Sequence, residues 1–586
     1  MVSCRLVQAP LKSLSFAALS YVSGDASITK TILVDSKPFN VTINLEAYLR
    51  KAAEKQAKDP NSTELPIWVD AICIDQNNIP ERNAQVQRMG SIYSLAEEVI
   101  IWLGSGGSHI HLGVQRIKEH AKATRELGGV KAFADPDKRE TLSKLFKDMM
   151  LGDSAQRKGF FELFDFPWWT RAWVLQELAL AKKVVFLLKD NSITFDGIYH
   201  AILHYYVSIS DDPLQTINTI NLSKEEEKLF SRALNVINVR ALFEHGFSDR
   251  LSGTTLQSLL SQTKGVKATD ARDKIYGLLG MISDQAKGKI KPDYHLSVSQ
   301  IYTDIVLWHM AEYDTLSILS QCYADTRNDS QALPSWVPHW EPRDDKSPAT
   351  LFWEEYEDFQ TKTKLLPYHA SGSLTLSSHP WSADITKGML SLTGARLGSI
   401  TFLAEPANLP PQIFKDDVFA VAKEWLALDD KLGKQYQFTG ESTRMAIRRT
   451  MVADFHNREL HLPEGVKFKQ RGFALMLPDD IPVKMGGVAW GYKDSIMEYI
   501  NVVDKRRLAV TSEGWIGLVP DTTIVGDQVV VLVGGPVLYV IRSKAQSGTG
   551  YIPTCAVDTL IGEAYFHGFM DGQALQGRDL DTVILA

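Results

Sequence analysis

One carboxylate lies in the middle of an otherwise apolar helical stripe. In the segment WWTRAWVLQELALA, the residues that share one helix face are Trp173, Val174, Glu177, Leu178 and Ala181. A carboxylate that faces a core costs free energy unless it is paired or hydrogen-bonded. Glu177 is therefore a candidate for chemistry in a buried site. A structural ion pair with Arg171 or another arginine is the alternative.

Two aspartates mark the end of a second apolar segment. Asp70 interrupts the apolar run at 65–74, and Asp75 and Gln76 follow this run directly. In open parallel sheets, ligands bind outside the carboxyl ends of the strands. Asp75 and Gln76 are thus placed for ligand contact, unless Asp75 only caps the loop that follows.

Other polar clusters favour no further chemistry. The glycine-rich segment 104–108 could bind phosphate through backbone N–H groups, but it lacks full GxGxxG spacing and fits a loop better. His109 and His111, like His456 and His461, lack Cys or acidic partners at zinc-site spacing, so we predict no metal site. The chain has no GxxxxGK[ST] and no GxSxG motif, which leaves a P-loop NTPase and a common type of hydrolase unsupported.

Apolar runs predict the strands that position these residues. The runs that read as buried strands are 16–22, 65–74, 99–103 and 184–188. A small hairpin is predicted over 32–43, with its turn at 35–38.

Helix signals separate these strands. One helix is predicted to begin at Asn44, and a second at Asn78-Ile-Pro80-Glu81, where a capping Asn, a proline in the first turn and a glutamate three residues after the cap coincide. A third helix is predicted over about 168–181, and 105–160 is predicted to be less regular.

The alternation of strands and helices predicts an α/β fold with a parallel sheet covered on both sides. We place this domain at residues 1–205. Residues 206–384 are predicted to form a mainly helical middle region with a Pro/Trp-rich connector. Residues 385–586 are predicted to be a mixed α/β region that ends in a small antiparallel β-rich unit at about 514–565.

Composition places the chain among ordinary globular proteins. It has 586 residues, of which 44% are hydrophobic and 23% charged, with a net charge of −7. This balance gives no argument for nucleic-acid binding. The four cysteines are far apart, the N-terminus has no continuous apolar signal region, and no apolar run is long enough to span a bilayer. We therefore expect a cytoplasmic protein.

Three sequence blocks resemble the fungal heterokaryon incompatibility (HET) domain. They are ALSYVSGD at 18–25, LPIWVDAICIDQ at 65–76 with its continuation to Gly104, and RAWVLQELALA at 171–181. Ser23 departs from the family pattern, which usually has tryptophan there. Later blocks extend the resemblance over most of the chain: DARDKIYGLLG at 270–280, PDY at 292–294, LPSWVP at 333–338, 514–520 and 562–572.

HET domains are in turn similar to TIR domains. The segment ALSY at 18–21 resembles the FISY of the first TIR strand, and WVLQEL at 173–178 resembles the TIR motif WCxxEL, whose glutamate is catalytic in TIR enzymes that cleave NAD. The resemblance therefore implies a TIR-like (flavodoxin-like) N-terminal domain and a catalytic role for Glu177. Tyr21, Asp75 and Trp173 are expected as substrate-binding residues.

The resemblance implies a protein of self/non-self recognition that triggers cell death. Its enzymatic form would be an NAD⁺ glycohydrolase, in which a carboxylate stabilises oxocarbenium charge on the ribose and no metal or further cofactor is needed. The alternative is a non-enzymatic signalling module that acts by regulated self-assembly. A homo-oligomer and a protein trigger are the expected partners, and the sequence leaves open the identity of the trigger and whether the product is linear or cyclic.

Overall fold

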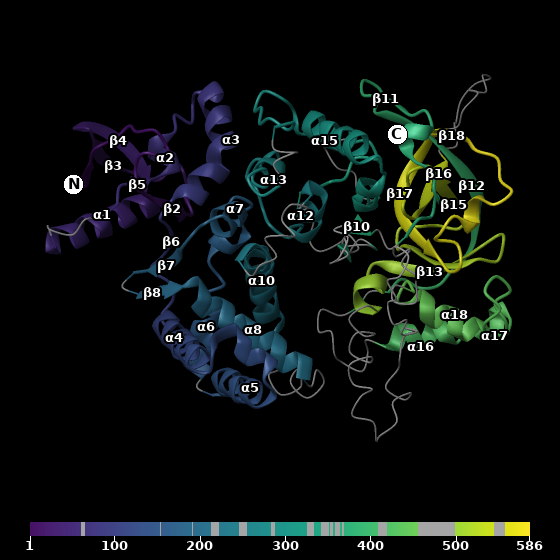
Figure 1. The fold of residues 1–586 in the computed structure, drawn as a ribbon, viewed down its shortest axis with the longest axis horizontal. Coiled ribbons are helices and arrows are strands. Elements are labelled where there is room, and N and C mark those ends of the chain that lie inside the picture. The colour runs from purple at the N-terminus through teal and green to yellow at the C-terminus, as the bar shows by residue number, and fades with distance from the viewer. Residues whose placement is uncertain are drawn as a thin grey trace. The chain divides into compact units, whose positions relative to one another are not determined.

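The computed structural model divides into two compact units, Met1–His295 and Leu296–Ala586, which are described separately (Figure 1). The division lies within the predicted middle region 206–384, and the predicted domain limits stay predictions. The residues that the structure describes are 1–59, 65–152, 154–189, 191–211, 222–244, 255–282, 288–324, 333–341, 351, 356–357, 364–365, 368–407, 409, 419–454, 499–543 and 557–586.

A five-stranded sheet forms the centre of the first unit. Its strands lie in the order β5 (Ile67–Trp68), β2 (Ala17–Tyr21), β6 (Glu98–Gly104), β7 (Val184–Leu188) and β8 (Asn191–Thr194). The first four are parallel, and the last is antiparallel to its neighbour. Counted along the chain the order is 2-1-3-4-5, so the chain crosses the sheet in both directions from its first strand. The prediction of a mixed α/β unit built on a parallel sheet is confirmed.

Helices and a small second sheet surround these strands. The hairpin of β3 (Thr29–Val34) and β4 (Lys37–Thr42) lies where it was predicted and pairs with β1 (Ser3–Cys4). The helices of this unit are α1 (Ile43–Lys58), α2 (Asp70–Cys73), α3 (Ile79–Leu95), α4 (Ile110–Glu126), η1 (Gly129–Ala134), α5 (Pro136–Leu151), α6 (Ser154–Glu162), η2 (Pro167–Thr170), α7 (Val174–Ala179), α8 (Phe195–Asp211), α10 (Lys224–Glu244), α12 (Leu256–Gln262) and α13 (Asp273–Tyr276).

The two faces of β2 meet different helices. Leu19 and Tyr21 share a core with Leu45 and Tyr48 of α1. Successive side chains of a strand point to opposite faces. Ser20 therefore points away from α1, and its hydroxyl reaches Glu177 of α7 instead.

Four local predictions were wrong in their extent. The predicted strand 65–74 keeps only the two residues of β5, because the Asp70 carboxylate accepts from the backbone N–H of Ala71 at 2.7 Å and turns the chain into α2. The predicted helix 168–181 is broken at Arg171 between η2 and α7. There the chain pairs with a distant segment, as Ala172 N donates to Lys267 O at 2.7 Å.

The other two errors concern a cap and a region. Helix α1 begins after Thr42, because the Asn44 side chain is used elsewhere: it donates to Val22 O at 2.7 Å and accepts from Trp102 Nε1 at 2.9 Å. The stretch 105–160 is largely helical, in α4, α5 and α6. Their long charged side chains obscured the apolar faces.

The second unit is dominated by β-strands, drawn mainly in green and yellow in Figure 1. Six strands close into a ring, because β12 pairs with both β13 and β15 and the others follow in the order β13-β14-β17-β16-β15. The elements are α15 (Val298–Tyr313), η3 (Ser317–Gln321), β9 (Tyr356–Glu357), β10 (Lys364–Leu365), η4 (Leu376–Ser378), β11 (Ser382–Asp384), β12 (Met389–Leu403), α16 (Ala420–Leu426), α17 (Asp429–Leu432), α18 (Thr443–Thr450), β13 (Arg506–Thr511), β14 (Ile516–Pro520), β15 (Gln528–Leu532), β16 (Leu538–Ser543), β17 (Val557–Phe566), η8 (Gln573–Leu575) and β18 (Asp581–Leu585).

The predicted antiparallel β-rich end is confirmed, and it is larger than expected. Strands β13 to β17 pair antiparallel, as the glycine-separated β-branched runs predicted. The 15-residue β12 pairs in turn with β18, β15 and β13, and its register shifts between Arg396 and Gly398 and again between Ile400 and Phe402. Almost half of the predicted connector at 330–380 lies outside the described residues.

Candidate functional site

Glu177 lies in α7 against the carboxyl-terminal half of β2. The residue is 5% exposed. The Ser20 hydroxyl donates to its Oε2, and the indole Nε1 of Trp168 donates to Ser20 Oγ at 2.7 Å. Ser20 accepts one hydrogen bond and donates the other, so it links the indole to the carboxylate. We call Ser20, Tyr93, Trp168 and Glu177 the Glu177 network.

Tyr93 of α3 completes this network. Its hydroxyl donates to Leu19 O at 3.3 Å and also makes a hydrogen bond with the Glu177 carboxylate. A phenol has one proton to donate. Tyr93 therefore shares this proton between two acceptors when Glu177 is ionised, and it can accept from Glu177 when the carboxyl is protonated.

Burial sets the charge state of Glu177. Removal from water raises its pKa from the ordinary value of 4.5 to about 7, and the nearby Asp70 carboxylate acts in the same direction. The charge of Arg171 and the hydrogen bonds from Ser20 and Tyr93 oppose this rise. Glu177 therefore changes between neutral and ionised forms close to neutral pH.

A second polar group lies at the carboxyl end of β2. Tyr21 is buried, and its hydroxyl hydrogen-bonds with the half-buried Asp70 carboxylate and with Ser23. Burial raises the pKa of both Tyr21 and Asp70 above their usual values. The guanidinium of Arg171 donates to Tyr21 O. The positive charge of Arg171 lowers the pKa of Glu177 through space, and no direct salt bridge between the two side chains is seen in the described structure.

The predicted site residues do not form a single cluster. Tyr21 follows Ser20 along β2 and therefore points to the opposite face of the sheet from Ser20. Trp173 is half-buried, and its indole hydrogen-bonds with Asp273 of α13. Asp75 is exposed in the loop after α2, where its Oδ1 accepts from Asn77 N at 3.0 Å. This contact matches the loop-capping alternative, and the substrate-binding role of all three stays a prediction.

The sequence analysis did not single out the other three members of the Glu177 network. Ser20 is the one polar residue of the apolar run FAALSYV, which is a usable signal. Tyr93 and Trp168 carry no such signal, because each sits among other aromatic or apolar residues. Their role depends on contacts that span up to 148 positions along the chain.

The glycine-rich loop after β6 holds a carboxylate of the protein itself. Glu162 accepts from His109 N at 3.1 Å, and its other oxygen lies 3.3 Å from His109 Nδ1. A Cβ at Gly107 would come within 2.6 Å of this carboxylate, so a larger residue there would displace the Glu162 side chain. Here the loop fastens α6 to the start of α4.

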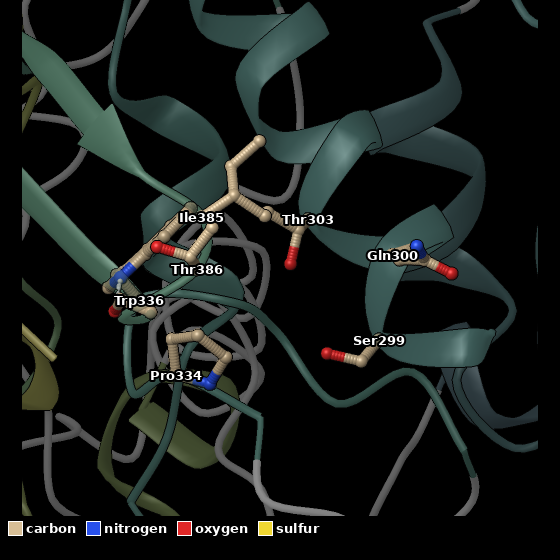
Figure 2. A pocket seen from close by; sticks show the side chains of 8 residues that line it. Ser299, Gln300, Thr303, Pro334, Trp336, Ile385 and Thr386 are labelled. Atoms are coloured by element: carbon tan, nitrogen blue, oxygen red, sulfur yellow. Dashed lines mark hydrogen bonds between the residues drawn. The ribbon is translucent and has the colours of Figure 1, made fainter. Parts of the chain in front are cut away.

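A pocket is present in the second unit, whereas the described residues hold no cluster of metal ligands. No group of three His, Cys, Asp or Glu residues that could hold a metal occurs in the described part of the chain, and His456 and His461 lie outside it. A pocket of about 290 Å³ lies in the second unit, at the start of α15 and beside the beginning of β12. Figure 2 shows the side chains that line it. Its lining comes from the second unit alone, so it is not part of the Glu177 network.

Glu177→Gln should change how the stability of the chain depends on pH. Between about pH 4.5 and 7 the folded parent binds more protons at Glu177 than the unfolded chain, so its unfolding free energy falls as pH rises. The variant lacks this loss, and we expect it to be more stable than the parent by up to about 3 kcal/mol at pH 8. The two chains should differ far less at pH 5.

Thermal unfolding of both chains at pH 5 and pH 8 tests this expectation. A difference in unfolding temperature that is the same at both pH values would contradict the raised pKa of Glu177.

Comparison with known proteins finds two family matches. Residues 16–177 match the family of the heterokaryon incompatibility protein (HET), and residues 489–581 match the Het-6 beta-barrel domain. The first match contains β2, β6 and Glu177, and the second covers most of the closed ring of strands. The predicted resemblance to HET proteins is therefore confirmed.

A relative supports the same class over the whole chain. Heterokaryon incompatibility protein 6, OR allele, of Neurospora crassa is 25% identical over an alignment of 662 positions, which covers 97% of this chain and 91% of the relative. These matches show that the chain is similar to fungal heterokaryon incompatibility proteins over most of its length. No solved structure matches the chain significantly.

In the part of the chain that the structure describes, we find no helix with the length and hydropathy needed to cross a membrane.

Proposed function

We propose that this heterokaryon incompatibility protein has a TIR-like N-terminal unit that hydrolyses NAD⁺ at the nicotinamide–ribose bond and thereby triggers cell death. The observation that carries this proposal is the Glu177 carboxylate, which is buried, held by Ser20 and has a pKa of about 7. Buried carboxylates with perturbed pKa values concentrate at functional sites.

The sheet order supports this reading. The order 2-1-3-4-5 is that of flavodoxin-like sheets, in which ligands bind outside the carboxyl ends of the strands where the order reverses. Here that place lies at the ends of β2 and β6, next to the Glu177 network. The fifth strand, β8, departs from a fully parallel sheet because it runs antiparallel to β7.

The chemistry needs one ionised carboxylate near the ribose. The bond between the nicotinamide nitrogen and ribose C1′ breaks with its electron pair leaving on neutral nicotinamide, and positive charge develops on the ribose. Glu177 in its ionised form would stabilise this charge. Water then adds to C1′ and releases a proton, giving ADP-ribose. The hydroxyls of Ser20 and Tyr93 hold the carboxylate in place.

A substrate has to reach this carboxylate. Glu177 is 5% exposed, so the ribose hydroxyls must replace part of the hydrogen bonding that Ser20 and Tyr93 provide. We propose that Tyr21, Trp173 and Asp75 contact the substrate around this point. We also propose that a protein trigger and homo-oligomerisation bring about the opening.

The same burial favours a second candidate function. A carboxylate satisfied by internal hydrogen bonds, with the charge of Arg171 nearby, also suits a structural network in a module that signals by self-assembly without catalysis.

Product analysis separates the two candidates. The purified full-length protein is incubated with NAD⁺, alone and after enforced oligomerisation, and the products are separated by chromatography. Release of nicotinamide with linear or cyclic ADP-ribose supports the enzyme. No release in either state would overturn the catalytic proposal and favour assembly.

A further inference from the structure

Lys274 is a buried lysine outside the residues that match the HET family. It lies in α13 and is 2% exposed. Its ammonium donates to Val266 O at 2.8 Å, to Thr263 O at 3.1 Å and, more weakly, to Lys264 O at 3.5 Å. A buried ammonium is costly unless it is hydrogen-bonded, and these carbonyls fold the segment 263–266 around it.

This segment continues directly into the strand contact that breaks the helix before Glu177. The backbone N–H of Lys267 donates to Thr170 O, and Ala172 N donates to Lys267 O at 2.7 Å. Lys267 and Arg171 thereby form a parallel bridge. Arg171, whose charge lowers the pKa of Glu177, is thus held in place by Lys267. Lys267 directly follows the segment whose carbonyls bind the Lys274 ammonium.

Asp273, the neighbour of Lys274 in α13, connects the same region to Tyr294 and Trp173. Its carboxylate accepts from the Tyr294 hydroxyl at 2.5 Å and hydrogen-bonds with the Trp173 indole. Tyr294 in turn contacts α3: its ring lies 3.7 Å from the guanidinium carbon of Arg82, and its N–H donates to Asn83 Oδ1 at 3.2 Å. Two neighbouring residues of α13 are therefore linked to the start of α7 and to α3, the helices that carry Glu177 and Tyr93.

We propose that Lys274 and Asp273 form a clamp that positions Arg171 and α7 relative to the Glu177 carboxylate. Lys274 is a positioning residue in this arrangement, because it acts through the 263–267 segment and does not itself touch Glu177. The consequence for catalysis rests on the proposed NAD⁺ cleavage, whereas the clamp itself does not. The DARDKIYG segment at 270–277 thereby supports the position of Glu177, although it begins about ninety positions after the matched residues 16–177.

Hydrogen exchange of the full-length chain tests the clamp. Lys274→Met removes the charge and the donors while keeping an unbranched side chain. We expect exchange in the segment 168–181 to become about tenfold faster, the effect of losing one or more charge-assisted hydrogen bonds. Lys267→Met is the matched control, since the exposed side chain of Lys267 takes no part in the backbone bridge. Equal exchange in Lys274→Met and the parent would overturn the clamp.

A second readout tests the link to Glu177 without relying on activity. The difference in unfolding temperature between each chain and its Glu177→Gln derivative is measured from pH 5 to pH 9. The pH at the midpoint of the change in this difference reports the pKa of Glu177 in the folded chain. In Lys274→Met, Arg171 is no longer held near Glu177, so the pKa of Glu177 should rise and the midpoint should move to higher pH. In Lys267→Met the midpoint should stay at the parental pH. Faster exchange with an unmoved midpoint would overturn the positioning role.

Two further results keep the proposals separable. If the parent does not cleave NAD⁺, the proposed function fails, while exchange and the pH midpoint still decide the clamp. If Lys274→Met does not fold, Asp273→Asn is measured instead. Its amide oxygen can still accept from Tyr294, so it should fold and show a smaller but real increase in exchange over 168–181; no increase would overturn the clamp.

Discussion

Replacing Glu177 by glutamine should lower NAD⁺ cleavage by roughly 10²–10³ while leaving the fold intact. Losing one preorganised stabilising group typically costs this much in rate. Glutamine keeps the shape, and its amide oxygen can still accept from Ser20, so the Glu177 network loses its charge and little else. The measurement is the rate of nicotinamide release at pH 8, where the parent carboxylate is ionised.

Glu97→Gln is the matched control for this experiment. It makes the same substitution in the same unit, at a half-exposed carboxylate paired with Lys182 at the surface. We expect its rate to equal that of the parent. A Glu177→Gln chain that folds and cleaves NAD⁺ at the parental rate would end the catalytic claim. A Glu177→Gln chain that does not fold would favour the structural role instead.

The largest effect on stability is expected from the buried ion pair of the second unit. Arg506 is fully buried, and its Nη2 lies 2.7 Å from Glu563 Oε1, which also accepts from Leu351 N at 2.6 Å. Glu563→Gln removes the negative charge and leaves the guanidinium buried without it. Breaking such a pair costs about 3–5 kcal/mol. We expect the unfolding transition of this unit to fall by roughly 6–20 °C in calorimetry.

Lys434→Met provides the comparison in the same unit. Lys434 pairs with Asp430 at the surface, where both side chains are about three-quarters exposed. Exposed pairs contribute about 0–1 kcal/mol, so this variant should unfold close to the parent temperature. Equal shifts in the two variants would contradict the importance of burial at Arg506.

The sequence predicted those helices and strands that are set by interactions between residues close together in the chain. The Asn78 side chain accepts from Glu81 N at the start of α3, as the cap and the proline in the first turn indicated. The apolar runs that became β2, β6 and β7 were recognisable because strands of a covered parallel sheet are apolar on both faces. The hairpin of β3 and β4 is set by its own turn.

Distant contacts decided the elements that sequence reasoning misjudged. The helix expected over 168–181 is interrupted because Lys267, almost a hundred positions later, pairs with the backbone on both sides of Arg171. The helical stripe correctly marked Glu177 as inward-facing, but its local spacing held no information on which groups lie opposite.

The sequence by itself determined the resemblance of the chain to HET proteins, the α/β character of its first unit, the β-rich character of its end and the inward direction of Glu177. These follow from motifs and from periodicities that repeat within a few residues. Only the tertiary structure decided that Ser20, Tyr93 and Trp168 surround Glu177, that Tyr21 and Trp173 contact other partners, and that Asp75 lies in an exposed loop. Such contacts join residues far apart in the chain, and the burial they create, rather than any local pattern, raises the pKa of Glu177.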